Sequence, residues 1–258
     1  MSVIEIVALV AAGTAAGAIN AVAGGGTLIT FPTLLFFHTA PVVANATSTL
    51  ALVLGTGGSV YGYRQHLPAV KRWLWRFLPV SILGGLIGSA LLTQTSDKTF
   101  SKLVPFLILF ATVVFLAQGV VRRILRHQEA SSQDKPARVW AAIAFQLAVS
   151  TYGGYFGAGI GILMLASLGF IGLTNIHEMN TVKTVLSSVI NVVAATWFVA
   201  AGLIDWPKAA VMTGGALAGY YLGSHCSQRI SPQRVRQVIT AIGFMLSVVT
   251  FYKEFIAR

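Results

Sequence analysis

Two glycine-rich stretches interrupt an otherwise apolar chain and decide its fold: AINAVAGGGTLITFP at residues 18–32 and STYGGYFGAGIGILM at residues 150–164. Adjacent glycines weaken a helix because glycine loses more backbone freedom on folding than other residues. Each stretch leads into a short apolar segment, Thr27–Phe37 or Ile160–Gly172. Both segments are shorter than the roughly 20 residues that a membrane-spanning helix needs. The pattern predicts two matched helix breaks, each followed by a short segment.

The composition predicts an all-α integral membrane protein. Hydrophobic residues make up 55% of the chain, charged residues only 10%, and the mean hydropathy is +0.77. A soluble domain has about 25% charged residues, so this chain has too few to cover a surface that faces water. Three apolar runs approach or match the length of a helical span: Phe77–Leu92, Leu103–Val121 and Val182–Ala201.

The net charge of +11 is concentrated in short breaks between the apolar runs, at Arg64–Arg76, Arg122–Arg138 and Arg229–Arg236. Clustered basic residues are typical of loops between membrane spans. No polar segment is long enough for a nucleic-acid-binding domain, so we expect no nucleic-acid partner. The charge instead favours contact with an anionic lipid leaflet and attraction of an anionic substrate. Glu5 and the lack of a basic residue before the first apolar run predict a retained first span rather than a signal peptide.

The chain repeats itself at a constant offset of 135 residues. Asn45 aligns with Asn180 and Thr49 with Thr184 without any gap, and Gly84-x-x-x-Gly88-Ser aligns with Gly219-x-x-x-Gly223-Ser. A match of Asn and of a spaced motif in one register indicates a duplication. We therefore expect a first transmembrane repeat at residues 1–121, a linker at 122–138 and a second repeat at 139–258.

Loop charge predicts that the two repeats are inverted. The linker has five basic and two acidic residues, which predicts a cytoplasmic location. The loop Arg64–Arg76 has four basic residues and no acid, whereas its counterpart around Asp205 and Lys208 is neutral. The bias also reverses between the loop near Asp97 and its basic counterpart. We expect eight long transmembrane helices plus two short broken or re-entrant segments, with both termini outside. If the short segments do not cross the membrane, the repeats are instead parallel.

The glycine breaks are the first candidate site. Irregular backbone at membrane depth is tolerated only where it is buried in protein or lines a cavity. Transporters with inverted repeats use such breaks to bind ions at the membrane midplane. The alternative is close helix packing through small residues, which we expect for Gly84-x-x-x-Gly88 and its repeat. Neither break has the Lys-Ser/Thr of a P-loop. The candidate substrate-binding residues in the breaks are Gly24, Gly25, Gly26, Thr27, Gly157, Gly159 and Gly161.

The polar starts of the two following helices supply the second set of candidates. These residues are Asn45, Thr47, Ser48 and Thr49 in the first repeat, and Asn180, Lys183 and Thr184 in the second. Asn180, Lys183, Thr184 and Ser187 share one helix face, which should face a cavity or another helix. A cation within a span indicates an anion site, unless Lys183 reaches the interface or pairs with an acid. Glu178 and His177 are possible coupling residues, or else a helix-start acid and a loop histidine.

These stretches resemble the sulfite exporter TauE/SafE family of membrane permeases over essentially the whole chain. The resemblance rests on G-x-x-N-x-x-x-G-G-G-T at Gly17–Thr27, ANATST at Ala44–Thr49, and YGGYFGAGIGILMLASLGF at Tyr152–Phe170. NIHEMNTVKT at Asn175–Thr184 and the stretch Ala201–Gly223 extend it. It implies a permease of the bacterial inner (plasma) membrane for sulfite, a sulfonate or another small sulfur-containing or organic anion. It also implies that the candidate residues meet at one substrate site.

The expected function is alternating-access movement of a small anion, with an anion channel or a structural membrane subunit as alternatives. An enzyme needs positioned acids, bases, nucleophiles or metal ligands. The seven acidic residues lie mostly in predicted loops, the five histidines lack ligand spacing and Cys226 is the one cysteine. We therefore expect no catalytic residue, no metal and no cofactor, and a small anion and the bilayer as partners. The sequence leaves the oligomeric state and any H⁺ or Na⁺ coupling open.

Overall fold

The computed structural model describes residues 1–22, 25–62, 64–127, 136–170, 173, 175–226 and 232–256. These residues form α-helices and one short 3₁₀ turn, and the described part of the chain contains no strand. The elements are α1 (Val3–Val22), α2 (Thr27–Phe36), α3 (Pro41–Gly62), η1 (Arg64–His66), α4 (Leu67–Gln94), α5 (Asp97–His127), α6 (Pro136–Tyr155), α7 (Ile160–Phe170), α8 (Ile176–Ala200), α9 (Trp206–Cys226) and α10 (Pro232–Phe255). The prediction of an all-α fold is confirmed.

Helix length separates two short elements from the rest. Helix α2 has 10 residues and α7 has 11, whereas every other described α-helix has at least 20. Five of the long helices, α1, α4, α5, α8 and α10, are long and apolar enough over their described residues to cross a membrane. The protein therefore carries several candidate membrane spans, while a count of eight crossing helices stays a prediction.

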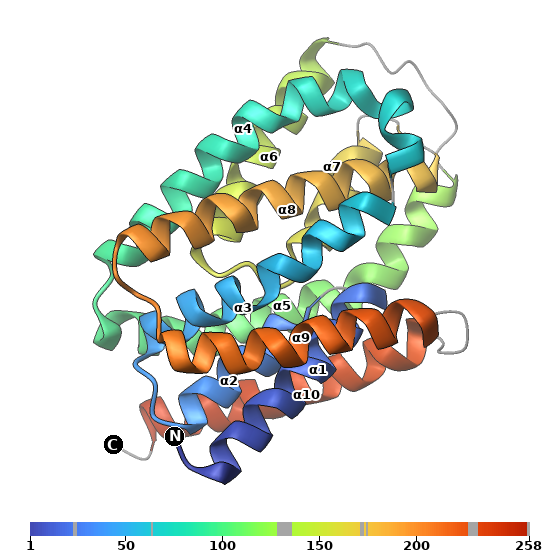
Figure 1. Cartoon of the computed structure of the whole chain (residues 1–258). Coiled ribbons are helices and arrows are strands. Elements are labelled where there is room, and N and C mark those ends of the chain that lie inside the picture. Colours follow the sequence, from blue (N-terminus) through green and yellow to red (C-terminus); the bar gives the residue numbers. More distant parts are fainter. Residues whose placement is uncertain are drawn as a thin grey trace.

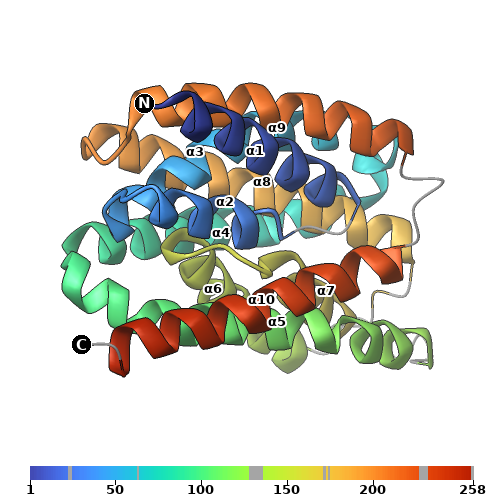
Figure 2. The ribbon, with the colours of Figure 1, turned by 90° about the horizontal axis from the view of Figure 1, so that it is seen from below.

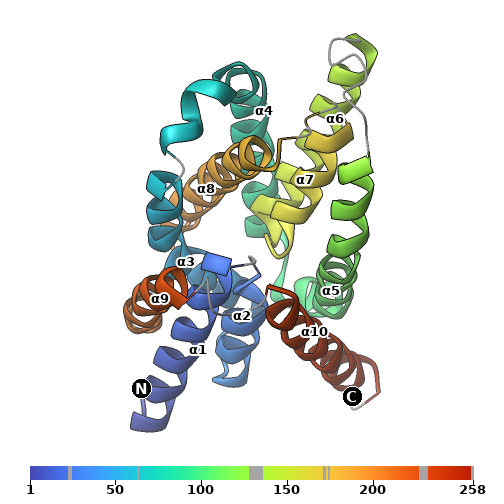
Figure 3. The same cartoon turned by 90° about the vertical axis from the view of Figure 1, so that its right-hand side faces the viewer.

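The long helices form a bundle in which distant parts of the chain lie side by side (Figure 1). Helix α1 packs along α9, and α4 packs along α6. Helix α8 lies against α3 and α4, and α5 pairs with α10, as Figure 2 shows from below. Figure 3 looks along the bundle and shows α3, α7 and α8 near its centre, with α1, α4, α5, α6, α9 and α10 arranged around them.

Small residues permit the closest of these helix crossings. A Cβ added at Gly88 of α4 would meet the Thr151 carbonyl group of α6. A Cβ added at Gly219 of α9 would likewise meet the Thr14 carbonyl group of α1. Because both spaced glycine motifs face a neighbouring backbone, the predicted packing role of Gly84-x-x-x-Gly88 and Gly219-x-x-x-Gly223 is confirmed.

The bundle has two distinct ends. The chain begins and ends at the same end of the bundle (left in Figure 1), where α8 also connects to α9. We call this the termini end. Helix α5 ends and α6 begins at the opposite end, near η1, and we call this the linker end. The short helices α2 and α7 start near the middle of the bundle and run toward the termini end and the linker end, respectively.

Candidate functional site

A cavity of about 240 Å³ lies in the middle of the bundle, where the two chain breaks meet. Residues of α1, α2, α3, α5, α7, α8 and α9 line it together with both breaks. Because a water molecule takes up about 30 Å³ in the liquid, this volume accommodates a small anion together with water. The polar side chains that line it are Asn20, Thr27, Thr49, Thr56, Asn180, Lys183, Thr184, Ser187, Ser188, Asn191 and Tyr220.

Glycine is required where the backbone breaks. Gly25 has a φ of 97°, Gly157 of 80° and Gly159 of 81°, all in the left-handed region. A residue with a Cβ pays about 1–2 kcal/mol to adopt this conformation. The Phe115 ring also lies against Gly25, so no side chain fits there. The glycine runs therefore interrupt the helices as predicted; Gly24 lies outside the described residues.

Side chains hold the broken backbone in place. The Gly26 amide donates a hydrogen bond of 2.7 Å to Asn20 Oδ1, which ties the first break to the end of α1. The Tyr152 hydroxyl donates a hydrogen bond of 2.7 Å to the Ala158 carbonyl oxygen, which bridges the second break. Each break is thus anchored to the helix that precedes it.

Both short helices point their N-termini at the cavity. Thr27 begins α2 and Ile160 begins α7, and both residues line the cavity. The Leu28 and Ile29 amides donate to the Gly25 and Gly26 carbonyl oxygens, and the Ile162 amide donates to that of Gly159. The aligned peptide dipoles still add partial positive charge at each helix start. No side chain caps the start of α2. The two helix starts therefore favour negative charge in the same space.

Lys183 brings a full positive charge to this cavity from the third turn of α8. Its aliphatic stem lies over Gly161, because a Cβ added to that glycine would be 3.3 Å from Lys183 Cδ and 3.6 Å from Cγ. Asn180, Thr184, Ser187 and Asn191, on the same side of α8, also line the cavity. The described lining residues include no Asp or Glu. The polar stripe thus faces the cavity, with Lys183 seated against the second break.

The structure brings most of the predicted site residues together. The residues that line the cavity are Gly25, Thr27, Thr49, Gly157, Gly159, Gly161, Asn180, Lys183 and Thr184. Gly26 is buried beside them, bonded to Asn20.

Three predicted residues of α3 lie outside the cavity, on its termini side. Asn45 Nδ2 donates to the Tyr155 carbonyl oxygen at 3.0 Å, and Ser48 Oγ lies 2.6 Å from Thr30 Oγ1. Thr47 Oγ1 accepts from the Asp205 amide at 3.1 Å. All three side chains are at most 1% exposed. In this conformation they connect helices instead of meeting the cavity.

The possible coupling residues, His177 and Glu178, lie in the first turn of α8. The Asn175 side chain caps the helix by accepting from the His177 and Glu178 amides, and its Nδ2 donates to Glu178 Oε1 at 3.1 Å. The His177 ring stacks on His66 of η1 with centroids 5.6 Å apart. Neither His177 nor Glu178 lines the cavity. The helix-start interpretation of Glu178 agrees with this geometry.

Sequence reasoning missed Asn20, Thr56, Ser188 and Tyr220 as cavity residues. Asn20 is the asparagine of the G-x-x-N motif at Gly17–Asn20, and this motif could have marked it as a site residue. Tyr220 is hydrogen-bonded to the Asn20 side chain. Tyr220 also packs its ring against Gly55, a contact between α9 and α3 that no local pattern predicts.

Comparison with known proteins now identifies the family. The family model described as sulfite exporter TauE/SafE matches residues 9–250. The chain belongs to this family. A TauE/SafE relative in Haemophilus influenzae, named a probable membrane transporter protein, is 28% identical over 94% of this chain and 92% of its own.

Two further relatives carry the name probable membrane transporter protein. The protein of Escherichia coli strain K12 is 22% identical over 92% of this chain and 86% of its own. The protein of a Sinorhizobium species is 23% identical over 90% of this chain and 87% of its own. No solved structure matches the chain. TauE/SafE membership, the apolar helices and the transporter relatives identify a multi-pass membrane transporter rather than an enzyme.

Proposed function

We propose that the chain is a permease that moves a small anion across the membrane by alternating access at the central cavity. The observation that carries this proposal is Lys183 seated on Gly161 in a cavity whose other polar lining groups are hydroxyls and amides. A basic side chain that lines a cavity within the bundle attracts negative charge, so an anionic substrate suits this cavity.

Neutral donors complete the coordination of an anion. Hydrogen bonds to a charged group contribute about 1.5–3 kcal/mol each, more than those between neutral groups. The amide groups of Asn20, Asn180 and Asn191 and the hydroxyls of Thr184 and Ser187 surround the space that Lys183 reaches. Together with the starts of α2 and α7 they satisfy several oxygen atoms at once. An oxyanion suits such a donor set.

The substrate class that we propose is sulfite, a sulfonate or a related sulfur-containing or organic anion. It is supported by the family to which the chain belongs, which is described as sulfite exporters. The named relatives are described as probable membrane transporters without a substrate, so they support transport and leave the anion open.

We further propose that residues 1–121 and 139–258 are inverted repeats. At the 135-residue offset α3 and α5 start at the counterparts of the first residues of α8 and α10. The packing partners also exchange: α1 with α9 corresponds to α6 with α4. Matched helices run in opposite directions along the bundle in Figure 1. These observations support five segments in each repeat, four long helices and one short segment, with the two repeats exchanging their conformations during transport.

The charged residues support an orientation for this arrangement. The residues Arg64–Arg76, predicted as a loop, instead form η1 and the first turns of α4 at the linker end. The basic residues of the predicted linker that the structure describes belong to the end of α5 and the start of α6, at the same end. By the positive-inside rule this end is cytoplasmic, and both termini are outside. The setting we propose is the bacterial inner membrane, which follows from the bacterial relatives of the chain.

Ligand-induced stabilisation of the purified protein tests the substrate proposal. Ligand binding to the folded state raises the melting temperature, so sulfite, sulfate, thiosulfate, sulfonates and carboxylates are compared at equal ionic strength. We expect one class to stabilise wild type and the Lys98→Ala control but not Lys183→Ala. Lys98 is exposed at the start of α5 and does not line the cavity. Equal stabilisation of Lys183→Ala would remove Lys183 from the site.

A further inference from the structure

The cavity extends from the breaks in the middle of the bundle toward the linker end. Thr56 is near the linker end of α3, Tyr220 is near that of α9, and Asn180 is in the second turn of α8 from that end. On the termini side of the breaks the side chains are closely packed. Thr30, Phe31 and Asn45 are at most 1% exposed there. The structure is therefore closed toward the termini end.

Aromatic rings and one asparagine form the inner part of this closure. Phe31 packs edge-to-face on Phe156 and Phe100, with ring centroids 5.5 and 6.1 Å apart. Asn45 Nδ2 donates to the Tyr155 carbonyl oxygen at the end of α6. The contacts of Phe31 with Phe156 and of Asn45 with Tyr155 join the first repeat to the second across the path that an anion would follow toward the termini end.

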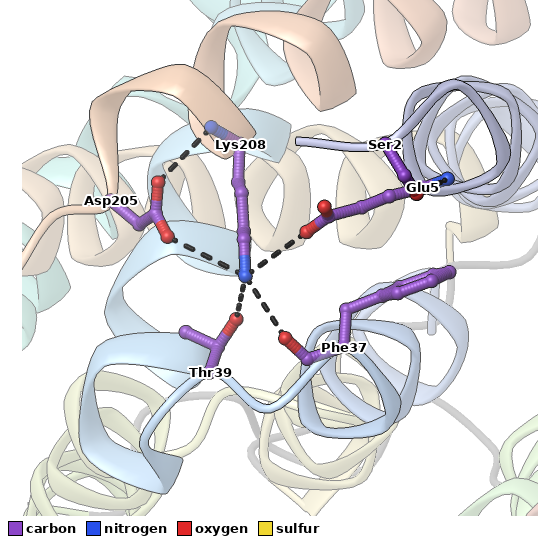
Figure 4. Close-up of polar contacts among 6 residues, drawn as sticks. All are labelled: Ser2, Glu5, Phe37, Thr39, Asp205 and Lys208. Carbon is purple, nitrogen blue, oxygen red and sulfur yellow. Dashed lines mark hydrogen bonds and ion pairs between the residues drawn. The ribbon is translucent and has the colours of Figure 1, made fainter.

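Lys208 closes the outer part, and Figure 4 shows its environment. Its ammonium group lies 3.2 Å from Glu5 Oε1 and 3.7 Å from Asp205 Oδ2. It also donates hydrogen bonds to Thr39 Oγ1 at 2.9 Å and to the Phe37 carbonyl oxygen at 3.1 Å. We call these five residues the Lys208 cluster. It joins the starts of α1 and α9 to the connection between α2 and α3.

The Lys208 cluster is mostly buried, so separating its residues costs free energy. The side chains of Lys208 and Glu5 are each 13% exposed. A partly buried cation with four oxygen partners loses much more than an exposed surface pair when those partners separate. The Asp205 amide also bonds to Thr47, which links the cluster to α3. Three cavity-lining helices, α1, α3 and α9, are therefore fastened at their termini ends.

The three charged residues of the Lys208 cluster have uncharged counterparts in the other repeat. At the 135-residue offset Glu5 corresponds to Trp140, Asp205 to Val70 and Lys208 to Trp73. None of these counterparts is charged. In a protein whose repeats exchange conformations, such an asymmetry favours the state that is closed toward the termini end.

We propose that the Lys208 cluster is the latch of an outer gate, which must separate before the cavity can open toward the termini end. This inference rests on the alternating-access function proposed above. Lys208 lies 12 residues before the cavity residue Tyr220 on α9, about 18 Å along the helix axis at a rise of ~1.5 Å per residue. It therefore acts on the conformational equilibrium and not by touching the anion.

Ser48 is a suitable position for a probe of gate opening. Ser48 corresponds to Lys183 at the repeat offset and is fully buried on the closed side. If the gate opens, Ser48 should become accessible in the way that Lys183 is now. A thiol at this position reports on the outer pathway without any substrate.

Cysteine labelling tests the latch. Ser48→Cys is introduced with Cys226→Ser, because Cys226 is the one native cysteine. The purified protein is labelled with a small charged methanethiosulfonate reagent. We expect Lys208→Ala and Glu5→Gln to raise the labelling rate about tenfold. This factor corresponds to the smallest contribution expected from a hydrogen bond to a charged group. Lys98→Ala, at the same end of the bundle, should leave the rate unchanged.

A second reporter separates gate opening from general loosening. Ser89→Cys replaces a fully buried residue of α4, outside the Lys208 cluster. It should stay unreactive in every variant. The proposal is overturned if Ser48→Cys is labelled at the same rate in Lys208→Ala as in Lys98→Ala, if it stays unreactive throughout, or if Ser89→Cys labelling rises equally. The labelling assay contains no anion, so its outcome does not depend on which anion binds the cavity. Likewise, the stability screen can identify an anion even if the Lys208 cluster is not a latch.

Discussion

Replacing Gly161 by alanine tests whether the position of the Lys183 side chain against Gly161 determines anion affinity. The added methyl group would stand 3.3 Å from Lys183 Cδ, so the side chain must shift by a few tenths of an ångström. Losing the charged hydrogen bond entirely should cost about 1.5–3 kcal/mol. A partial shift should cost about 1 kcal/mol, which lowers affinity roughly fivefold. Gly161→Val should approach the effect of Lys183→Ala.

Stability should change in the opposite direction to affinity. Alanine is favoured over glycine within a helix by up to about 1 kcal/mol, and Gly161 lies within α7. The matched control is Gly214→Ala in α9, where an added Cβ would meet nothing within 4 Å. Melting curves with and without the stabilising anion measure both quantities. The reasoning is refuted if Gly161→Ala binds the anion as tightly as Gly214→Ala does.

Two further substitutions test the framework around the site. Gly157→Ala should destabilise the protein by about 1–2 kcal/mol, because Gly157 has a φ of 80°, and thermal unfolding against Gly214→Ala measures the loss. An equal melting temperature for these two variants would contradict a required left-handed residue at the second break. Asn175→Ala should cost about 1 kcal/mol by removing the cap of α8, whereas Asn175→Ser should retain most of the stability, as denaturant unfolding would show. Identical loss in both variants would mean that the cap is not the cause.

The 135-residue offset predicts which helices of the two halves correspond, because matched sequences form matched helices and breaks. The glycine runs mark both breaks, since the positive φ at Gly25 and Gly157 disfavours residues with a Cβ. The stripe from Asn180 to Asn191 follows from helix periodicity alone. Loop charge predicts the orientation of the helices relative to the membrane, because basic residues favour the cytoplasmic side.

The rest depends on contacts between distant residues and on conformational state. Asn45 and Asn180 occupy the same register, yet Asn45 bonds to Tyr155 while Asn180 lines the cavity. A repeat alignment therefore cannot say which of two matched residues lines the cavity. The contacts of Tyr220 with Gly55 and of Lys208 with Glu5 likewise need the assembled bundle.

Counterflow of radiolabelled sulfite into proteoliposomes tests the central claim most directly, with the anion found in the stability screen used instead if it differs. Unlabelled anion inside the vesicles should drive saturable uptake by wild type and by Lys98→Ala. Lys183→Ala should fold, as judged by an unchanged melting temperature without ligand, and show no saturable uptake. Saturable uptake by Lys183→Ala at the wild-type rate would contradict anion transport through the Lys183 cavity.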